Sequence, residues 1–245
     1  MPSETLPPVR LSARARADLP ELMDDLAADP GLTRQSLREL AFLNTYFGGY
    51  PIVLGAFDRL LPRLRALGRP VRVLDLATGS GDVLRKVAQW ARRRNLPLAG
   101  VGIDINPVMA AYATAQSQDY PELRYEVADS WSRELLAHAP DVVLSSQFCH
   151  HLSDDELVRY LRWLYELSGT ALVVSDLHRH PVAFHFIRLA TRVFSRSEQV
   201  RYDAPLSVAR GMTGPEWRAA LAEAGISGYR LGWRWAFRWQ IVAAK

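Results

Sequence analysis

The feature that most constrains this chain is an apolar run that passes through a glycine-rich turn into a helical pattern. Residues 71–76 are largely apolar, as in a buried parallel strand, and Lys86, Val87 and Trp90 continue the chain with helical spacing. Between them, Gly79 and Gly81 supply turn conformations and leave the backbone bare for a ligand to approach. A strand, a glycine turn and a helix in this order predict a cradle for a nucleotide-type cofactor.

The glycines of this turn do not match a dinucleotide-binding site. The pattern G-x-G-x-x-G requires a third glycine where the helix packs closely on the strand, and Leu84 occupies that position. The run D-L-A-T-G-S-G instead resembles the first motif of class I S-adenosylmethionine (SAM) methyltransferases. The resemblance places several residues near the methionine end of SAM: Asp75, Ala77, Thr78, Gly79, Ser80 and Gly81.

Three further strand ends follow in the order that this family has. The second strand ends in Asp104 and Ile105, and a carboxylate there can accept hydrogen bonds from two ribose hydroxyls, or can cap a helix before Pro107. The third ends before Asp129, which is placed to accept from the adenine amino group. Trp131 either lies along the adenine face or packs in the core. Two serines at strand ends complete the expected cofactor site: Ser130 and Ser146.

The resemblance covers roughly residues 70–178 and extends more weakly over most of the chain. Residues 20–24, 44–50, 206–217 and 221–225 look like parts of bacterial small-molecule methyltransferases related to those of ubiquinone and menaquinone biosynthesis. The implied fold is α/β, with a Rossmann-like sheet of seven mostly parallel strands. Residues 229–233 and 237–243 are expected to close this sheet as an antiparallel hairpin.

Helical patterns precede the first strand. Residues 19–28, 34–47 and 52–67 have helical apolar spacing, with breaks at 30–31 and 48–51. Because ligands bind beyond the carboxyl ends of parallel strands, we expect a helical cap over that edge, comprising residues 1–68, before a SAM-binding domain at 69–245. The polar or aromatic residues expected to contact substrate from the cap are Asn44, Tyr46 and Tyr50, unless they form a capped turn and core tyrosines.

Residues 178–213 are predicted to form an inserted lid segment after the fifth strand, residues 171–176. Within it, residues 182–194 combine apolar and aromatic side chains with arginines. They either line an apolar substrate pocket, with Phe184 in its wall, or rest on a membrane surface or partner. Arg179 is a candidate to hold an anionic substrate, and Gln147 at the end of the fourth strand is a further substrate contact.

Four histidines follow the fourth and fifth strands. His150 and His151, then His178 and His180, approach the same crevice. A phenol, enol or activated carbon acceptor must lose a proton, so a histidine base is expected, with His151 as first choice and His178 as second. His150 is assigned to substrate positioning or to the turn. Methyl transfer requires no metal, and consecutive side chains are expected to diverge, so no metal site is predicted at Cys149-His150-His151.

Composition favours one soluble domain. The 245 residues are 49% hydrophobic, contain no apolar run as long as a membrane span and begin without a secretory core. A single cysteine, Cys149, fits a reducing compartment, so a cytoplasmic location is predicted, compatible with peripheral membrane contact. The net charge of +4 is modest, and no nucleic-acid partner is expected. The oligomeric state is left open.

The predicted function is SAM-dependent methyl transfer, with S-adenosyl-L-homocysteine as product. The acceptor is expected to be an aromatic, polyketide or quinone-like small molecule, methylated on oxygen or carbon. Two alternatives remain: a SAM-binding enzyme with non-methylating chemistry, and a catalytically silent binding protein of the same fold.

Overall fold

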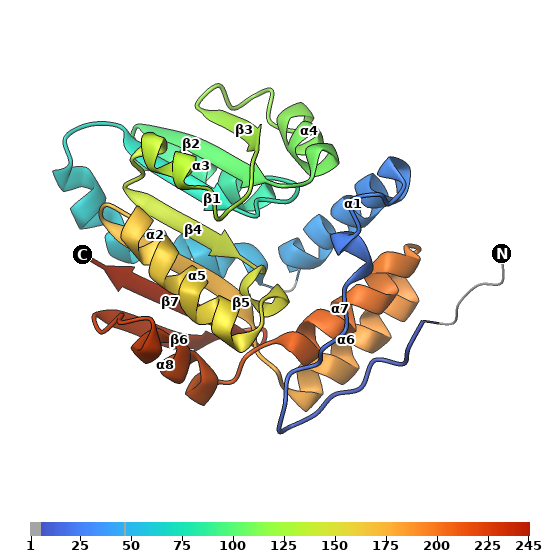
Figure 1. Ribbon diagram of the computed structural model, residues 1–245. Coiled ribbons are helices and arrows are strands. Elements are labelled where there is room, and N and C mark those ends of the chain that lie inside the picture. Colours follow the sequence, from blue (N-terminus) through green and yellow to red (C-terminus); the bar gives the residue numbers. More distant parts are fainter. Residues whose placement is uncertain (1–5, 47) are drawn as a thin grey trace.

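A seven-stranded sheet forms the centre of the protein (Figure 1). The computed structural model describes residues 6–245 except residue 47 and the side chain of residue 46. The strand order is β3-β2-β1-β4-β5-β7-β6. Strands β1 to β5 are mutually parallel, whereas β7 runs antiparallel to both β5 and β6, which confirms the predicted fold class. The strands are β1 (Val71–Leu76), β2 (Leu98–Asp104), β3 (Leu123–Val127), β4 (Val142–Ser146), β5 (Ala171–Leu177), β6 (Tyr229–Arg234) and β7 (Arg238–Ala244).

Helices cover both faces of this sheet. On one face, α2 (Gly49–Ala66) and α3 (Asp82–Arg92) pack on the side chains of Val71 and Val73. On the other, α5 (Asp154–Leu167) and α8 (Gly214–Glu223) pack on Leu74 and Leu76. The alternation along β1 thus buries both faces, which explains why its sequence is almost continuously apolar. Helix α4 (Pro107–Ala115) lies against β2 and β3.

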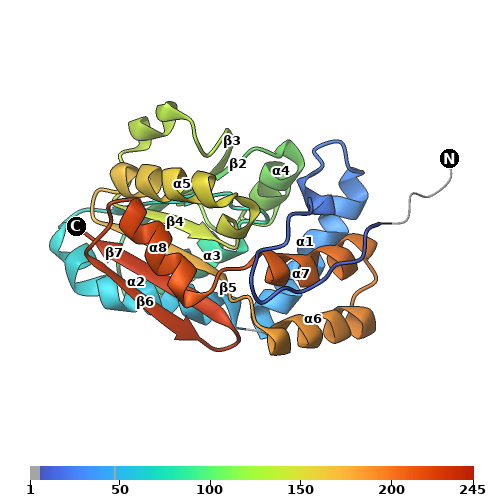
Figure 2. The same cartoon turned by 60° about the horizontal axis from the view of Figure 1, so that its bottom comes forward.

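Three more helices form a layer beside the carboxyl ends of the parallel strands (Figures 1 and 2). They are α1 (Pro30–Tyr46), α6 (Pro181–Phe194) and α7 (Glu198–Arg210). Helix α7 contacts both α1 and α6. The chain before α1 runs across α7, where the Ala17 amide donates to the Ala209 carbonyl, and contains one short 3₁₀ helix, η1 (Leu22–Asp24). Helix α1 belongs to the segment predicted as the cap, and α6 and α7 belong to the segment predicted as the lid.

The beginning of the chain differs from the prediction. Residues 19–28 do not form a helix beyond the 3₁₀ turn, and Pro30 with Gly31 opens α1 instead of breaking it. The reason is local, because the Asp29 carboxylate accepts hydrogen bonds from the amides of Gly31 and Leu32. A proline in the first turn costs nothing there, since its missing amide would have had no partner within the helix.

Helix α2 also lies elsewhere than predicted. It precedes β1 and was expected in the cap, but Phe57, Leu60 and Leu64 are buried against the sheet. The apolar stripe of α2 packs on the apolar face of the sheet. This packing removes apolar surface from water, which stabilises the fold. Helix α7 was not among the helical segments predicted from the sequence, and Pro205 stands inside it.

No single helix among the described residues is long and apolar enough to cross a membrane. The bent pair Pro30–Thr45 and Gly49–Ala66 meets that test only when its two helices are taken together.

Candidate functional site

A cavity of about 630 Å³ opens at the carboxyl ends of β1, β2 and β4. Its wall combines these strand ends with residues from the N-terminal segment, α1 and α7. Most residues predicted for the cofactor line it: Asp75, Ala77, Thr78, Gly79, Ser80, Asp104, Ile105, Asp129, Ser130, Trp131 and Ser146. The predicted catalytic residue His151 lines it as well, together with three residues predicted to contact substrate: Asn44, Gln147 and His150. The cofactor and substrate predictions therefore converge on one space.

The two glycines of the β1–α3 turn have different tasks. Both have positive φ angles, 55° at Gly79 and 69° at Gly81, which favours glycine. No atom lies within 4 Å of the place where a Cβ of Gly79 would stand, so this backbone is open toward the cavity. A Cβ on Gly81 would come within 2.6 Å of the Tyr125 ring. Gly81 is absent from the cavity wall, so its contribution is close packing and not the ligand contact that was predicted.

Two buried aspartates shape the cofactor side. The Asp104 carboxylate accepts the Gly79 amide at 2.8 Å and the Asn106 amide at 2.9 Å, and thereby ties the glycine turn to the end of β2. The cap of α4 is Asn106, whose side chain accepts from the Val108 amide, so Asp104 is not the helix cap. The Thr78 hydroxyl donates to Asp75 at 2.6 Å.

Both carboxyl groups on this side are hard to ionise. Burial raises the pKa of Asp75 to about 7, assisted by the charges of Asp82 and Asp104, against the hydrogen bond from Thr78. Burial also raises the pKa of Asp104, although its two backbone hydrogen bonds oppose this. No cation neutralises these groups within the described residues. A ligand that brings donors or positive charge would therefore be stabilised here.

The end of β3 forms the far wall of the cofactor side. The Asp129 carboxylate accepts from the Trp131 amide at 3.0 Å, which fixes the turn. The Trp131 ring lies 4.9 Å from the Tyr160 ring and keeps 37% of its surface exposed. Packing holds one side of the indole and leaves another side open, so both suggested functions of Trp131 are compatible with its position.

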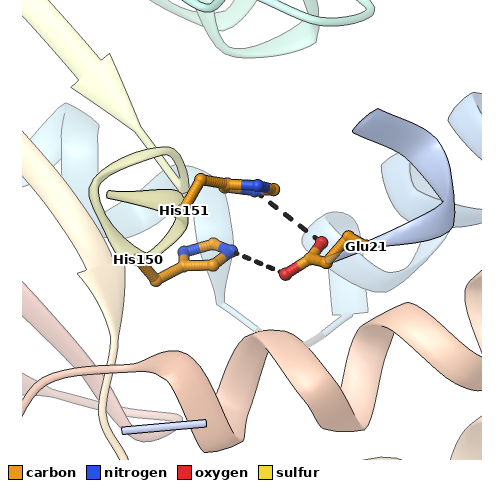
Figure 3. Close-up of side chains that lie close together, drawn as sticks. All are labelled: Glu21, His150 and His151. Atoms are coloured by element: carbon orange, nitrogen blue, oxygen red, sulfur yellow. Dashed lines mark ion pairs between the residues drawn. The ribbon is translucent and has the colours of Figure 1, made fainter. Parts of the chain in front are cut away.

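The opposite wall contains a polar centre made of Glu21, His150 and His151 (Figure 3). Glu21 lies just before η1, and both histidines lie in the 3₁₀ helix η3 (Cys149–His151). His150 Nε2 is 3.5 Å from Glu21 Oε1, and His151 Nε2 is 3.7 Å from Glu21 Oε2. We call this group the Glu–His centre.

Carboxylates outside the Glu–His centre hold the other nitrogen of each ring. His150 Nδ1 lies 2.6 Å from the Asp176 carboxylate at the end of β5, and His151 Nδ1 lies 3.1 Å from that of Asp24. The ring centroids of the two histidines are 4.4 Å apart. The expected divergence of consecutive side chains holds for Cys149, which is buried in the core, but not for the histidines, because both rings are turned toward Glu21.

The charges of the Glu–His centre are mutually balanced. Burial disfavours the protonated ring of His150, but Asp176 and Glu21 outweigh it and raise the pKa of His150 to about 9. Burial opposes ionisation of the carboxyl groups as well, yet the histidines hold the pKa values of Glu21, Asp24 and Asp176 below their ordinary ones. These carboxylates thus differ from those of the cofactor side, whose pKa values are raised.

Two arginines fix the N-terminal segment on the Glu–His centre. Arg16 donates to the carbonyls of His150 and Leu152 at 2.8 and 2.7 Å. Arg210 donates to the carbonyls of His150 and His151 at 3.0 and 2.7 Å. These bonds satisfy the carbonyls of η3 and place Glu21 opposite the two rings.

Four residues predicted for catalysis or substrate binding do not line the cavity. The Tyr50 hydroxyl donates to the Asp82 carboxylate at 2.7 Å. Asp82 lines the cavity and Tyr50 does not. His178 packs its ring against Trp239, with centroids 5.0 Å apart, and Arg179 pairs with Glu216 at 2.6 Å. Phe184 is buried between α6 and α7. In each case packing or ion pairing turned the side chain away from the strand ends. The side chain of Tyr46 lies outside the described residues.

Comparisons with known proteins agree with this geometry. Residues 73–168 match a family model described as a methyltransferase domain. These residues contain the glycine turn, Asp104, Asp129 and both histidines of the Glu–His centre. Residues 73–168 are therefore similar to a methyltransferase domain, and the match leaves the rest of the chain uncovered. A comparison with curated proteins found no match.

Solved structures of methyltransferases resemble the fold over most of the chain. The neocarzinostatin O-methyltransferase NcsB1 has a TM-score of 0.64 at 18% identity, over 92% of this chain and 62% of that one. Human N-acetylserotonin methyltransferase has a TM-score of 0.63 at 18% identity, and the match covers 89% of this chain and 56% of that one. The CMeT domain of the citrinin polyketide synthase has a TM-score of 0.54 at 16% identity, and the match covers 72% of this chain and 46% of that one. This chain therefore spans about half the length of the last two, and at these identities the likeness establishes the fold.

The structure also contains a buried cation that the sequence analysis missed. Arg238 of β7 is 6% exposed and lines a smaller cavity of about 100 Å³, which shares Asn44 and Gln147 with the larger one. Its Nη2 donates to Asn44 at 3.3 Å, whereas Nε and Nη1 have no hydrogen-bond partner in the described part of the chain. Burial lowers the pKa of Arg238 to about 10. In the sequence, this arginine is only one of several in an arginine- and tryptophan-rich hairpin.

Glu21 and Asp24 were missed as well. Both lie in the segment at residues 20–24 whose family resemblance was noted without a function. That resemblance was the available signal, since neither spacing nor charge distinguishes these acids from their neighbours.

Proposed function

We propose that this protein transfers the methyl group of SAM to a small-molecule acceptor. The observation that carries the proposal is that one cavity has the cofactor cradle on one wall and the Glu–His centre on the other. The two walls differ in charge balance, as expected for a site that must hold two ligands. The methyltransferase family match over residues 73–168 supports it.

SAM would lie along the carboxyl ends of β1, β2 and β3. Asp104 would accept hydrogen bonds from the ribose hydroxyls, and Asp129 would accept the adenine amino group. The methionine end would lie on the open backbone at Gly79, near the buried Asp75. A cationic, donor-rich ligand suits a wall whose carboxyl groups have no cation of their own.

The acceptor would occupy the rest of the cavity, between SAM and the Glu–His centre. This part is walled by the apolar side chains of Leu37, Leu40, Phe148 and Val200. We propose an aromatic or similarly flat acceptor, whose hydroxyl would face His150, His151 and Glu21. NcsB1, one of the similar structures, was solved with 1,4-dihydroxy-2-naphthoic acid, an aromatic hydroxy compound.

The reaction requires alignment and exclusion of water. An electron pair of the acceptor oxygen forms the bond to the methyl carbon while the carbon–sulfur bond breaks. SAM, when bound, would supply the electrophilic methyl group, with neutral S-adenosylhomocysteine as the leaving group. The acceptor proton would pass to His151, the proposed base, and from there to water. We propose that α1, α6 and α7 act as the lid that encloses the two ligands during this step. His151 remains a proposed catalytic residue, now together with His150 and Glu21.

The test combines binding and transfer. Calorimetry should show SAM and S-adenosylhomocysteine binding to the full chain, and methyl-labelled SAM should label hydroxylated aromatic or quinol compounds. Absence of SAM binding would refute the proposal. SAM binding without label transfer to any such compound would support the alternatives of non-methylating chemistry or a silent binding protein instead.

A further inference from the structure

We infer that Glu21, His150 and His151 form a binding site for one divalent first-row transition metal ion, of which Zn²⁺ is the representative. The function of this site, to hold the oxygen of the acceptor, rests on the proposed methyl transfer. One ligand atom from each of the three residues lies within 4.8 Å of the other two. Two imidazoles and one carboxylate are a ligand set that such ions use in catalytic sites.

The orientation of both rings is the first observation. In each histidine, Nδ1 is held by a carboxylate outside the Glu–His centre, Asp176 for His150 and Asp24 for His151. A proton on Nδ1 that faces this carboxylate leaves Nε2 as the ligand atom once Nε2 has lost its own proton to the incoming metal, and both Nε2 atoms face Glu21 (Figure 3). Metal-binding histidines almost always have such a carboxylate or carbonyl partner behind them. A Ser207 hydroxyl bond of 2.9 Å holds Glu21 in the same way.

The second observation is the spacing inside the Glu–His centre. A charge-assisted bond between imidazole and carboxylate is about 2.7–2.9 Å long. The bond from His150 to Asp176 is slightly shorter, at 2.6 Å. Toward Glu21 the same ring keeps 3.5 Å, and His151 keeps 3.7 Å. Two ligand atoms that each lie about 2.0–2.1 Å from a tetrahedral metal stand about 3.3–3.4 Å apart. The gaps are therefore longer than a short charge-assisted bond and close to the separation of two ligands of one ion.

The third observation is the position of the Glu–His centre. Glu21 is 7% exposed and His150 is 2% exposed, so an ion here would be largely shielded from bulk water. All three residues nevertheless line the 630 Å³ cavity, which leaves a coordination position open toward the proposed acceptor. Catalytic metal sites have this form, with three protein ligands and one exchangeable position. An acceptor hydroxyl bound there would be oriented and would lose its proton more easily.

Metal binding is tested on the full chain, stripped with a chelator, without SAM or acceptor. We expect one equivalent of Co²⁺ to give the visible absorption of a four- or five-coordinate ion, and Zn²⁺ to displace it. Glu21→Gln and His151→Gln should lower Co²⁺ affinity by about 100-fold or more, and Asp24→Asn by about 10- to 100-fold. Mg²⁺ should not compete, because it prefers oxygen ligands.

The matched control is His138→Gln. His138 also faces a carboxylate, with Nε2 3.3 Å from Glu126 Oε2, but outside the Glu–His centre. The His138→Gln variant should bind Co²⁺ with the affinity of the wild type. Equal Co²⁺ affinity in the wild type and in folded Glu21→Gln, or an equal loss in His138→Gln, would overturn the site.

The metal site and the proposed function can fail separately. Methyl transfer that persists unchanged in the chelated protein, with no Co²⁺ binding, refutes the metal site and leaves the methyltransferase function intact. Stoichiometric Co²⁺ binding without any SAM binding refutes the function and leaves the metal site.

Discussion

The carboxylates on the two sides of the cavity are held in opposite ways. On the cofactor side, burial raises the pKa values of Asp75 and Asp104, and the nearest charges are other acids. In and behind the Glu–His centre, histidines lower the pKa values of Glu21, Asp24 and Asp176. Asp203 is an exception on that side, with burial and the charges of Glu21 and Asp24 raising its pKa to about 7, against hydrogen bonds from the Leu22 and Met23 amides.

This difference shows that the two walls are prepared for different ligands. A wall whose buried carboxyl groups have raised pKa values and no cation as partner gains stability when a cationic ligand with several donors arrives. A wall whose carboxylates already face imidazoles has little to gain from such a ligand and instead presents fixed ring nitrogens. The following predictions separate the two walls, beginning with the largest expected effect.

Glu21→Gln should lower the rate of methyl transfer by about 10²-fold or more, because the carboxylate charge that faces both imidazoles is lost. SAM affinity should stay within about 2-fold of wild type, since Glu21 lies on the opposite wall. Turnover with labelled SAM and calorimetry with SAM check the two parts. A fall in SAM affinity as large as the fall in turnover would show that the walls do not act separately.

Asp75→Asn should change how stability depends on pH. An unfolded aspartate ionises near pH 3.8, whereas Asp75 in the folded protein does so at about 7. The native state therefore binds the extra proton in this range, and wild-type stability should fall as the pH rises from about 4 to 7, by about 4 kcal/mol at most. The variant lacks this fall, so its advantage over wild type should grow with pH in denaturant titrations.

Asp141→Asn is the control with the opposite sign. Asp141 is paired with Arg69 at 2.6 Å, and although burial opposes its ionisation, Arg69 and the Arg72 amide hold its pKa below the ordinary value. Its contribution to stability is present above pH 3.8 and is lost as the pH falls through the lowered pKa. Asp141→Asn should therefore be less stable than wild type at neutral pH. The same pH slope in both variants would contradict the assigned environments.

Asp104→Asn should weaken SAM binding by about 10- to 100-fold, since charge-assisted hydrogen bonds to the ribose become neutral ones. The amide keeps the size of the carboxylate, so the fold should persist, as circular dichroism would show. The control is Asp119→Asn at an exposed position, which should bind SAM as the wild type does. Unchanged calorimetric affinity in Asp104→Asn would remove Asp104 from the cofactor site.

His178→Gln should have the smallest effect, with turnover within about 2-fold of wild type. Its ring packs against Trp239 and His180 and lines neither cavity. The measurement is methyl transfer at saturating SAM. A large loss of turnover in a folded variant would restore the catalytic function that was predicted from its place after β5.

The cofactor wall was largely predictable because its contacts are close in the sequence. The Thr78–Asp75 bond, the positive φ angles of the glycines and the turn at Asp129 each depend on a few neighbouring residues. Gly81 was still misassigned, since its partner Tyr125 belongs to a strand that only the sheet brings close. The opposite wall was predicted in part, through His150, His151 and Gln147, which follow β4 directly.

The sequence by itself determined the strands, their parallel order and the cofactor cradle, because apolar runs, glycine positions and strand-end acids act within short stretches of chain. The tertiary structure alone decided which distant groups meet. It placed Asp24 against His151, 127 residues away, and Asn44 against Arg238, 194 residues away. Such contacts depend on how helices bury their apolar faces and on which charges are desolvated together, and no local pattern encodes either. For this reason His178, Arg179 and Phe184 were predicted at the site and lie outside it, whereas Glu21 was not predicted and lies at its centre.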